Sequence, residues 1–228
     1  MSDIFYNYMS KRLGDLELSN LKTKPGPVVT ISRLAGCSSQ HLAKELAAKL
    51  NKICGIEKWS VISKEVLQES AEKLQLEPKK IKTVFKIQDR SVFDDIIQAF
   101  LSKDYHLERK MRNTVINVIR RFSIEGYKII LGRGANIICA DIENALHVRI
   151  IGPLDWRIKK VMTTRNYNRE EAMRCIEKTE KDRITFRNSI KGKVVESDDF
   201  DLTINQSKYT NPEIIEIIIT ALQVKKII

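Results

Sequence analysis

The chain has 228 residues, of which 43% are apolar, and it carries a formal net charge of +11. This length favours a single domain, and the apolar content can form a buried core, which excludes a disordered chain. No apolar run approaches about 20 residues, which excludes a membrane-spanning helix on length. The positive charge suits polyanionic partners, either nucleic acid or small phosphorylated molecules, although solvated helix faces account equally well for most of these charges.

Residues 1–26 are expected to form an N-terminal arm or a short helix, which ends at the turn-rich joint KTKPGP. This segment lacks the basic start, the apolar middle and the cleavage site of a signal peptide. The cysteines are widely spaced and form no CxxC pair: Cys37, Cys54, Cys139 and Cys175. These features predict a reduced, cytoplasmic protein without structural zinc.

The first half of the domain, which begins at residue 27, alternates apolar runs with amphipathic stretches. VVTIS (28–32) is continuous and β-branched, as in a buried strand. The stretch that follows, 39–51, repeats leucine at every fourth residue and predicts a helix. WSVI (59–62) predicts a second, weaker strand. Helical patterns then fill most of 62–127, and Gly126 ends the last of them.

The second half of the chain continues the alternation. Three further strands are predicted, in chain order: KIILG (128–132), ALHVRIIG (145–152) and FDLTINQ (200–206). Two helices are predicted between the last two strands, over 153–166 and 169–190, and an apolar-faced helix over 212–226 closes the chain. Strands that alternate with helices of this length indicate βαβ units, and hence an α/β fold with a parallel sheet covered on both faces.

The segment between the first strand and the first helix lies where a P-loop would lie. A P-loop reads GxxxxGK[ST]: its glycines let backbone amides converge on phosphate, its lysine neutralises phosphate oxygens and its Ser/Thr binds Mg²⁺. Read from Arg33, the eight positions are Arg-Leu-Ala-Gly-Cys-Ser-Ser-Gln. Gly36 remains, whereas Ser38 takes the second glycine position, Ser39 the lysine position and Gln40 the magnesium position.

Two structures stay open for this segment: a phosphate cradle in which serines replace glycines, or an ordinary strand-to-helix turn. Arg33 is the cation on the strand side of the loop, and we expect it to lean across Gly36 and replace the lysine in part. The alternative is that Arg33 pairs with a carboxylate at the sheet edge. Cys37 lies near a helix N-terminus, which would lower the pKa of its thiol. His41, in the first helical turn, is a further candidate for a phosphate contact.

A series of motifs in chain order resembles the cytidylate kinase-like family, relatives of the nucleoside monophosphate kinases. The motifs are ISRLAGCSSQHLA (31–43), SKE (63–65), ILGRGA (130–135), PLDWRIKKVM (153–162), REEA (169–172), KTEKDR (178–183) and DLTINQS (201–207). Together they cover roughly residues 27–222. The resemblance implies a three-layer P-loop-type fold: a mostly parallel sheet of about five strands with helices on both faces and a helical lid.

The resemblance also implies an activity, namely transfer of the γ-phosphoryl group of ATP to a nucleoside monophosphate such as CMP. It implies ATP and Mg²⁺ as cofactors, a monophosphate-binding helical region over about 63–125 and a lid over about 155–195. The chain departs from the family pattern, since the loop glycines have become Cys37-Ser38-Ser39. Leu131 also stands where ordinary nucleotide kinases carry an aspartate, so the protein ligands of Mg²⁺ are not identified.

Position in the chain and the resemblance together assign roles to individual residues. Nucleotide phosphates are expected to bind to Arg33, Gly36, Cys37, Ser38, Ser39, Gln40 and His41. Arg133, at the carboxyl end of a predicted strand, and Lys64 are expected to bind the acceptor. Arg183, Arg187 and Arg165 lie on the two predicted lid helices. They are the expected catalytic cations, because arginine binds phosphate bidentately and stays charged.

Two other functions stay open. The first is a catalytically degenerate nucleotide-binding module, which would have lost the lysine, the aspartate and the glycines of the motif. The second is a basic RNA- or DNA-binding protein, which is disfavoured because no recognition motif occurs and aromatic residues make up only 7% of the chain. The expected partners are therefore nucleotides, with no membrane. Turnover with a panel of monophosphates separates an active kinase from a degenerate module.

Overall fold

The computed structural model describes residues 25–62, 105–191 and 199–228. Its elements are, in chain order, β1 (Val28–Arg33), α2 (Gln40–Cys54), β2 (Ser60–Ile62), α6 (Tyr105–Glu125), β3 (Lys128–Leu131), α7 (Ala135–Ile138), β4 (Ala145–Ile151), α8 (Leu154–Arg165), α9 (Arg169–Lys191), β5 (Leu202–Asn205) and α10 (Asn211–Val224). The five predicted strands are all present, and the helices predicted among the described residues agree within a few residues at each end. The short helix α7 was not predicted.

Several predictions fall outside this part of the chain. They are the N-terminal arm up to residue 24, the helical patterns and the SKE motif within 63–104, and the last residues of the expected lid, 192–195. The acceptor-binding role of Lys64 therefore stays a prediction. In the part of the chain that the structure covers, no helix is long and apolar enough to cross a membrane.

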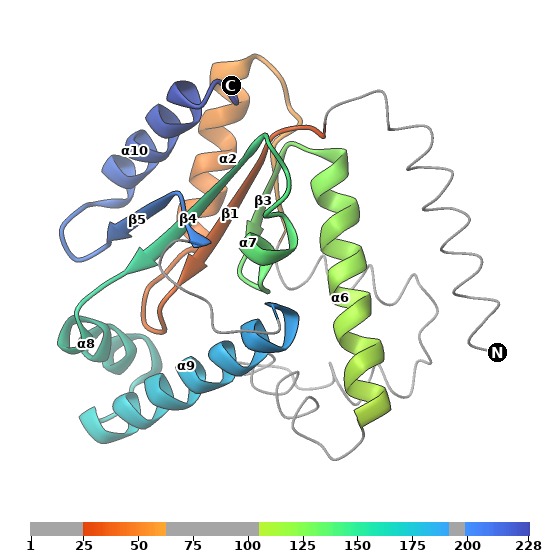
Figure 1. Cartoon of the computed structure of the whole chain (residues 1–228). Helices are drawn as coiled ribbons and strands as arrows, with labels where there is room; N and C mark the ends of the chain where they lie inside the picture. Colours follow the sequence, from red (N-terminus) through yellow and green to blue (C-terminus); the bar gives the residue numbers. More distant parts are fainter. Residues whose placement is uncertain (1–24, 63–104, 192–198) are drawn as a thin grey trace.

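The strands form one five-stranded sheet in the order β2-β3-β1-β4-β5 (Figure 1). Every ladder is parallel, with Val28 of β1 in register with Lys128 of β3 and with Ala145 of β4. This confirms the predicted α/β fold and its parallel sheet. Because all strands run the same way, their carboxyl ends meet at one edge, and α8 and α9 lie across that edge (Figure 1).

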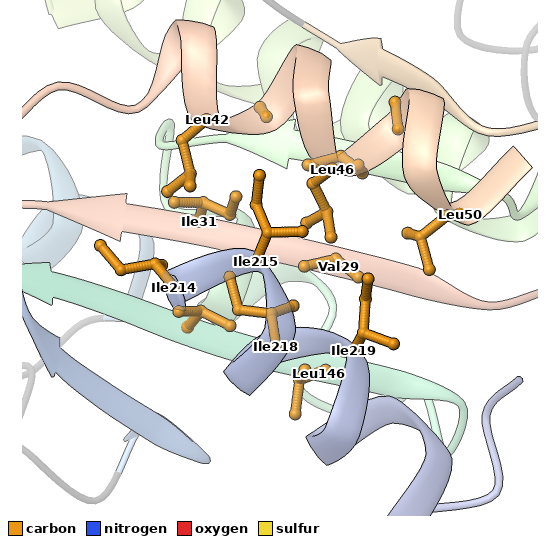
Figure 2. Packing of buried hydrophobic residues seen from close by; sticks show 14 of the residues in the cluster. Val29, Ile31, Leu42, Leu46, Leu50, Leu146, Ile214, Ile215, Ile218 and Ile219 are labelled. Carbon is orange, nitrogen blue, oxygen red and sulfur yellow. The ribbon is translucent and has the colours of Figure 1, made fainter. Parts of the chain in front are cut away.

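One face of the sheet is covered by α2 and α10. Figure 2 shows Leu42, Leu46 and Leu50 of α2 above Val29 and Ile31 of β1, with the isoleucines of α10 on the near side. The side chains labelled in Figure 2 are all buried. The leucines recur at every fourth residue and so form one stripe of the helix, while alternate strand residues point to one face. The apolar pattern of the sequence therefore fixes how these elements pack.

The opposite face is covered by α6 and α7. Val28 of β1 and Ile130 of β3 pack there against Ile119 of α6 and Ile138 of α7. A third, smaller cluster joins α8 and α9 to the loop after β1, through Ile158, Ile176 and Ala35 among others. The sheet thus has helices on both faces, and the α8–α9 pair is anchored separately at its carboxyl edge.

Candidate functional site

Three elements bring arginines together at the carboxyl edge, between β1 and β3. Arg33 is the last residue of β1, Arg133 follows β3, and Arg183 comes from α9. The Arg183 guanidinium donates from Nη1 to the backbone carbonyl of Arg33 at 2.9 Å. The Arg33 guanidinium lies against Gly132, where an added Cβ atom would be only 2.6 Å from Nη1. The fold therefore groups three residues for which phosphate contacts were predicted from separate motifs.

The electrostatic surroundings of Arg33 favour an anion. Burial, together with the positive charges of Arg183 and Arg133, lowers the pKa of its guanidinium to about 9. Among the described residues that shift this pKa, only the Cys37 thiol acts the other way. Arg33 still stays protonated at pH 7. Binding of an anion such as phosphate relieves the repulsion between like charges, and this stabilisation is largest where the charges are partly desolvated together.

An unusual backbone turn positions Arg133. Gly132, Arg133 and Gly134 have φ angles of +68°, +59° and +66°, so three successive residues are left-handed. A left-handed conformation costs about 1–2 kcal/mol for a residue with a side chain. The turn places Arg133 inside the protein, where it is only 8% exposed. Backbone strain of this kind is frequent at functional sites, and the Gly-Arg-Gly sequence after a strand is the signal that could have revealed it.

The loop between β1 and α2, residues 34–39, is clasped by side chains from distant elements. The amide of Ala35 donates to Glu180 Oε1 at 2.6 Å, and that of Ser38 donates to Gln206 Oε1 at 3.0 Å. Gln206 Nε2 in turn donates to the Ser38 carbonyl at 2.8 Å, and the Cys37 amide donates to a carbonyl within the same turn. A phosphate cradle would point these amides at one open position, whereas the amides of Ala35, Cys37 and Ser38 have three different acceptors within the protein. Phosphate binding by the loop stays a prediction.

Gly36 lies beside Arg157 and not beside Arg33. Its φ angle is +88°, and an added Cβ atom would lie 2.8 Å from the Cβ atom of Arg157. Arg157 Nη1 donates to the carbonyl of Ala35 at 3.0 Å, which holds α8 against the loop. The expectation that Arg33 leans across Gly36 is therefore wrong, because its guanidinium lies on Gly132 instead.

The remaining predicted loop residues surround the start of α2. Ser39 is buried at the N-cap position and makes no side-chain capping bond, whereas Ser38 and Gln40 are exposed. His41 is also exposed and faces Glu45, with 3.2 Å between Nε2 and Oε1. The helix N-terminus attracts anions. Contacts of Ser38, Gln40 and His41 with phosphate therefore stay predictions that this placement allows.

The thiol of Cys37 differs from what its position near a helix predicts. Burial raises its pKa to about 11, against the lowering effect of the nearby positive charges of Arg157 and Lys160. The expected lowering of the pKa is therefore wrong, since loss of hydration outweighs the helix and the cations. Cys37 is a neutral thiol at neutral pH. All four cysteines of the chain are free.

The two other predicted catalytic arginines lie on α9 and α8. Arg187 is one turn beyond Arg183 on α9; burial and the charge of Arg149 lower its pKa. Its Nε atom is buried and has no hydrogen-bond partner within the described ranges. Arg165 ends α8 and donates from Nη1 to Cys175 Sγ at 2.9 Å. The 12 residues of α8 span about 18 Å, so Arg165 lies about that far along the helix from Leu154, and the catalytic roles of Arg165 and Arg187 stay predictions.

The residues of this edge do not fit a magnesium ion held by the protein alone. Gln40 and Leu131 occupy the two positions where a P-loop kinase would offer a hydroxyl and a carboxylate, and Leu131 packs against the core. Within residues 25–62, 105–191 and 199–228, no three His, Cys, Asp or Glu residues gather in a metal-binding arrangement. Nucleotide phosphates commonly supply several of the Mg²⁺ ligands, so an ion that arrives with a nucleotide does not need a full set of protein ligands.

Three residues of the site were not predicted: Arg157, Glu180 and Gln206. Each lies within one of the motifs PLDWRIKKVM, KTEKDR and DLTINQS, and each contacts the 34–39 loop. Their signal in the sequence is weak, because each is a polar residue in a helix or after a strand. The clue was available at Gln206, since it is the last residue of a predicted strand, and the carboxyl end of that strand must lie at the edge.

Known proteins resemble this chain in sequence and in fold. The sequence model of the cytidylate kinase-like family matches residues 28–208, which include every described element from β1 to β5. No curated protein matches the chain.

Among solved structures, the chain is similar to an uncharacterized protein from Eubacterium ventriosum ATCC 27560, with a TM-score of 0.63 and 21% identity. The alignment covers 87% of this chain and 98% of the other, and shows a shared fold. The shikimate kinase from Acinetobacter baumannii has a TM-score of 0.49 at 12% identity, covering 91% and 98% of the two chains. That from Bacteroides thetaiotaomicron has 0.48 at 14%, covering 86% and 98%. These two likenesses are too weak to carry an argument.

Proposed function

The chain belongs to the cytidylate kinase-like family, and we propose that it transfers the γ-phosphoryl group of ATP to a nucleoside monophosphate such as CMP. The observation that carries the proposal is the grouping of Arg33, Arg133 and Arg183 at the carboxyl edge of the sheet. Phosphoryl transfer asks little covalent chemistry of a protein and depends on positioned positive charge. Ligands of open α/β sheets bind at this edge.

Each arginine has a role that follows from its position. Arg133 is buried and fixed by its left-handed turn, which suits it to hold the acceptor phosphate in one orientation. Arg33 lies close enough to Arg133 and Arg183 for their charges to affect its pKa, and it helps to bind the same acceptor phosphate. Arg183 comes from the α8–α9 pair, and its guanidinium is expected to stabilise the charge of the phosphoryl group during transfer.

We propose that the donor ATP binds at the start of α2. The partial positive charge of a helix N-terminus, about half a unit charge, attracts phosphate there. Ser38 and Gln40 present polar side chains to solvent at this point, and the cation of the P-loop lysine is replaced by the arginines of the edge. Mg²⁺ would neutralise phosphate charge when it arrives with the nucleotide.

A second function is favoured by one specific observation. The backbone amides of Ala35 and Ser38 donate hydrogen bonds to the side chains of Glu180 and Gln206. An active P-loop would direct these amides at phosphate. A catalytically degenerate nucleotide-binding module is therefore the alternative: it would retain the edge arginines and bind nucleotide without transfer.

Turnover separates the two functions. Purified full-length protein is incubated with ATP, Mg²⁺ and each of a panel of nucleoside monophosphates, and formation of ADP and of the diphosphate product is followed by chromatography. The proposal expects one monophosphate to be converted far faster than ATP is hydrolysed without an acceptor. Calorimetric binding of ATP without any turnover would support the degenerate module. Absence of both binding and turnover would contradict both functions.

A further inference from the structure

Glu180 places a carboxylate on the loop that follows β1. It lies in α9, and its Oε1 atom accepts the Ala35 amide at 2.6 Å. The same oxygen is 3.5 Å from Nη1 of Arg157, and both of these side chains are largely buried, with Glu180 21% and Arg157 11% exposed. Arg157 Nη1 also donates to the Ala35 carbonyl. One largely buried carboxylate therefore receives both a backbone N–H of the loop and the charge of a guanidinium.

These two donors are the kind that a protein offers to phosphate. Backbone amides in a strand-to-helix loop and an adjacent arginine together form an anion site. A carboxylate is itself an anion with oxygen acceptors, so it satisfies the same donors. In this structure the position at Ala35 is therefore occupied by an anion that belongs to the chain.

We propose that Glu180 is an internal competitor of nucleotide phosphate, and that the phosphates of a nucleoside polyphosphate displace it from Ala35 when they bind. The proposal rests on the proposed function, because it assumes that ATP binds to this loop. Displacement frees the Ala35 amide and the Arg157 guanidinium for the same phosphate. A polyphosphate carries more charge than one carboxylate, so it can win this competition where a weaker anion fails.

The neighbouring contact of α9 explains how the helix can stay in place when Glu180 leaves. Arg183 lies three residues further along α9, on a neighbouring part of the same helix surface. It holds the carbonyl of Arg33, which is two residues before Ala35 in the chain. Because this second attachment does not involve the carboxylate, release of Glu180 requires only a side-chain movement. Glu180 thereby sets the affinity of the loop for nucleotide phosphates, and it is not needed to hold Arg183 in position.

The test measures binding of two probes, ADP and inorganic tripolyphosphate, by isothermal titration to the full chain. Glu180→Gln keeps an oxygen acceptor for Ala35 but removes the charge, and Glu180→Ala removes both. Glu177→Gln is the matched control, since Glu177 is exposed on the same helix and changes the net charge equally. Tripolyphosphate lacks base and sugar, so a gain shared by both probes assigns the effect to the phosphate contacts.

We expect both Glu180 variants to bind both probes about 10- to 100-fold more tightly than the wild type, the scale of one charge-assisted hydrogen bond. Glu177→Gln is expected to show little change. If the wild type binds but the Glu180 variants bind no more tightly than Glu177→Gln, the competition is wrong and the proposed function stands. If no variant binds either probe, both are overturned. The Glu180→Gln variant keeps the test valid should Glu180→Ala fold poorly.

Discussion

Two regions of the sheet bury different kinds of side chain: the face beneath α2 and α10, and the carboxyl edge. On the face, buried side chains such as Leu46 and Ile218 are apolar and make contacts that any close-packed core would make. At the edge, Arg133 and Gln206 are buried to 8% and 5% exposure. A left-handed turn at the edge adds backbone strain. Folding alone does not favour buried charge and strain, so the contrast supports the proposal that ligands bind at the edge.

The contrast also separates two kinds of mutational effect. Changes on the face alter the free energy of unfolding and leave the chemistry of the folded protein unchanged. Changes at the edge are expected to alter binding and turnover, with smaller effects on stability. A substitution on the face that changes binding or turnover in the folded protein would contradict this division. So would a substitution at the edge that changes only stability.

The largest effect is expected from Arg183→Ala. Loss of a guanidinium that stabilises transferred phosphoryl charge lowers turnover by about 10³- to 10⁵-fold, whereas ATP binding changes far less. Kinetics and calorimetry on the same preparation measure the two effects. Arg174→Ala is the control, because Arg174 lies exposed on the same helix beside Glu170. Equal loss of binding and turnover, or no loss, would return Arg183 to a purely structural role.

On the face, Leu46→Ala is expected to lower the free energy of unfolding by about 2–5 kcal/mol, because it leaves a cavity in a fully buried position. Urea denaturation measures this loss. Below the unfolding transition, the Michaelis constants of the variant are expected to equal those of the wild type. A large change in substrate affinity would mean that the face and the edge are not separate.

A matched pair of glycines tests the edge by backbone alone. Gly132 and Gly55 both have left-handed φ angles, +68° and +64°, so alanine at either is expected to cost about 1–2 kcal/mol of stability. An added Cβ atom would meet Arg33 at Gly132, whereas nothing lies within 4 Å at Gly55. Gly132→Ala is therefore expected to weaken binding of the acceptor monophosphate, and Gly55→Ala to leave it unchanged. Equal binding by both variants would show that the position of Arg33 is unimportant.

The smallest effect is expected at the start of α10. Thr210 and Glu213 form a capping box, with the Thr210 amide donating to the Glu213 carboxylate at 2.7 Å. Thr210→Ala is expected to lower stability by about 1 kcal/mol, as measured by thermal or urea unfolding. Turnover should not change, since the cap belongs to the face. A loss of turnover at unchanged stability would place α10 within the site.

The fold was predictable because local sequence carries it. The β-branched run that became β1 and the leucine repeat that became α2 each indicate their structure within about ten residues, and parallel pairing follows from the alternation. The site was predictable only in part. Arg133 and Arg183 were found from motifs, but the bond between Glu180 and Ala35 joins residues 145 apart, and that between Gln206 and Ser38 joins residues 168 apart. No local pattern specifies such contacts.

Arg33 shows a different limit. Its type and its place at the end of β1 were clear from the sequence, but its direction was not. Gly132 has no side chain to block the Arg33 guanidinium, whereas Arg157 of α8 lies beside Gly36. The guanidinium therefore lies toward β3 and away from Gly36. Side-chain direction at a strand end depends on which neighbours are small, and those neighbours are brought together only by the fold.

The affinity of the edge arginines for phosphate tests the assignment of this site most sharply. The monophosphate that gives the highest turnover is titrated calorimetrically into wild type, Arg33→Ala and Arg174→Ala, each shown to be folded by circular dichroism. Arg33→Ala is predicted to bind it about 10- to 100-fold more weakly, the loss expected for one charged hydrogen bond, while Arg174→Ala binds like the wild type. Unchanged affinity in folded Arg33→Ala would contradict the assignment of the carboxyl edge as the phosphate site.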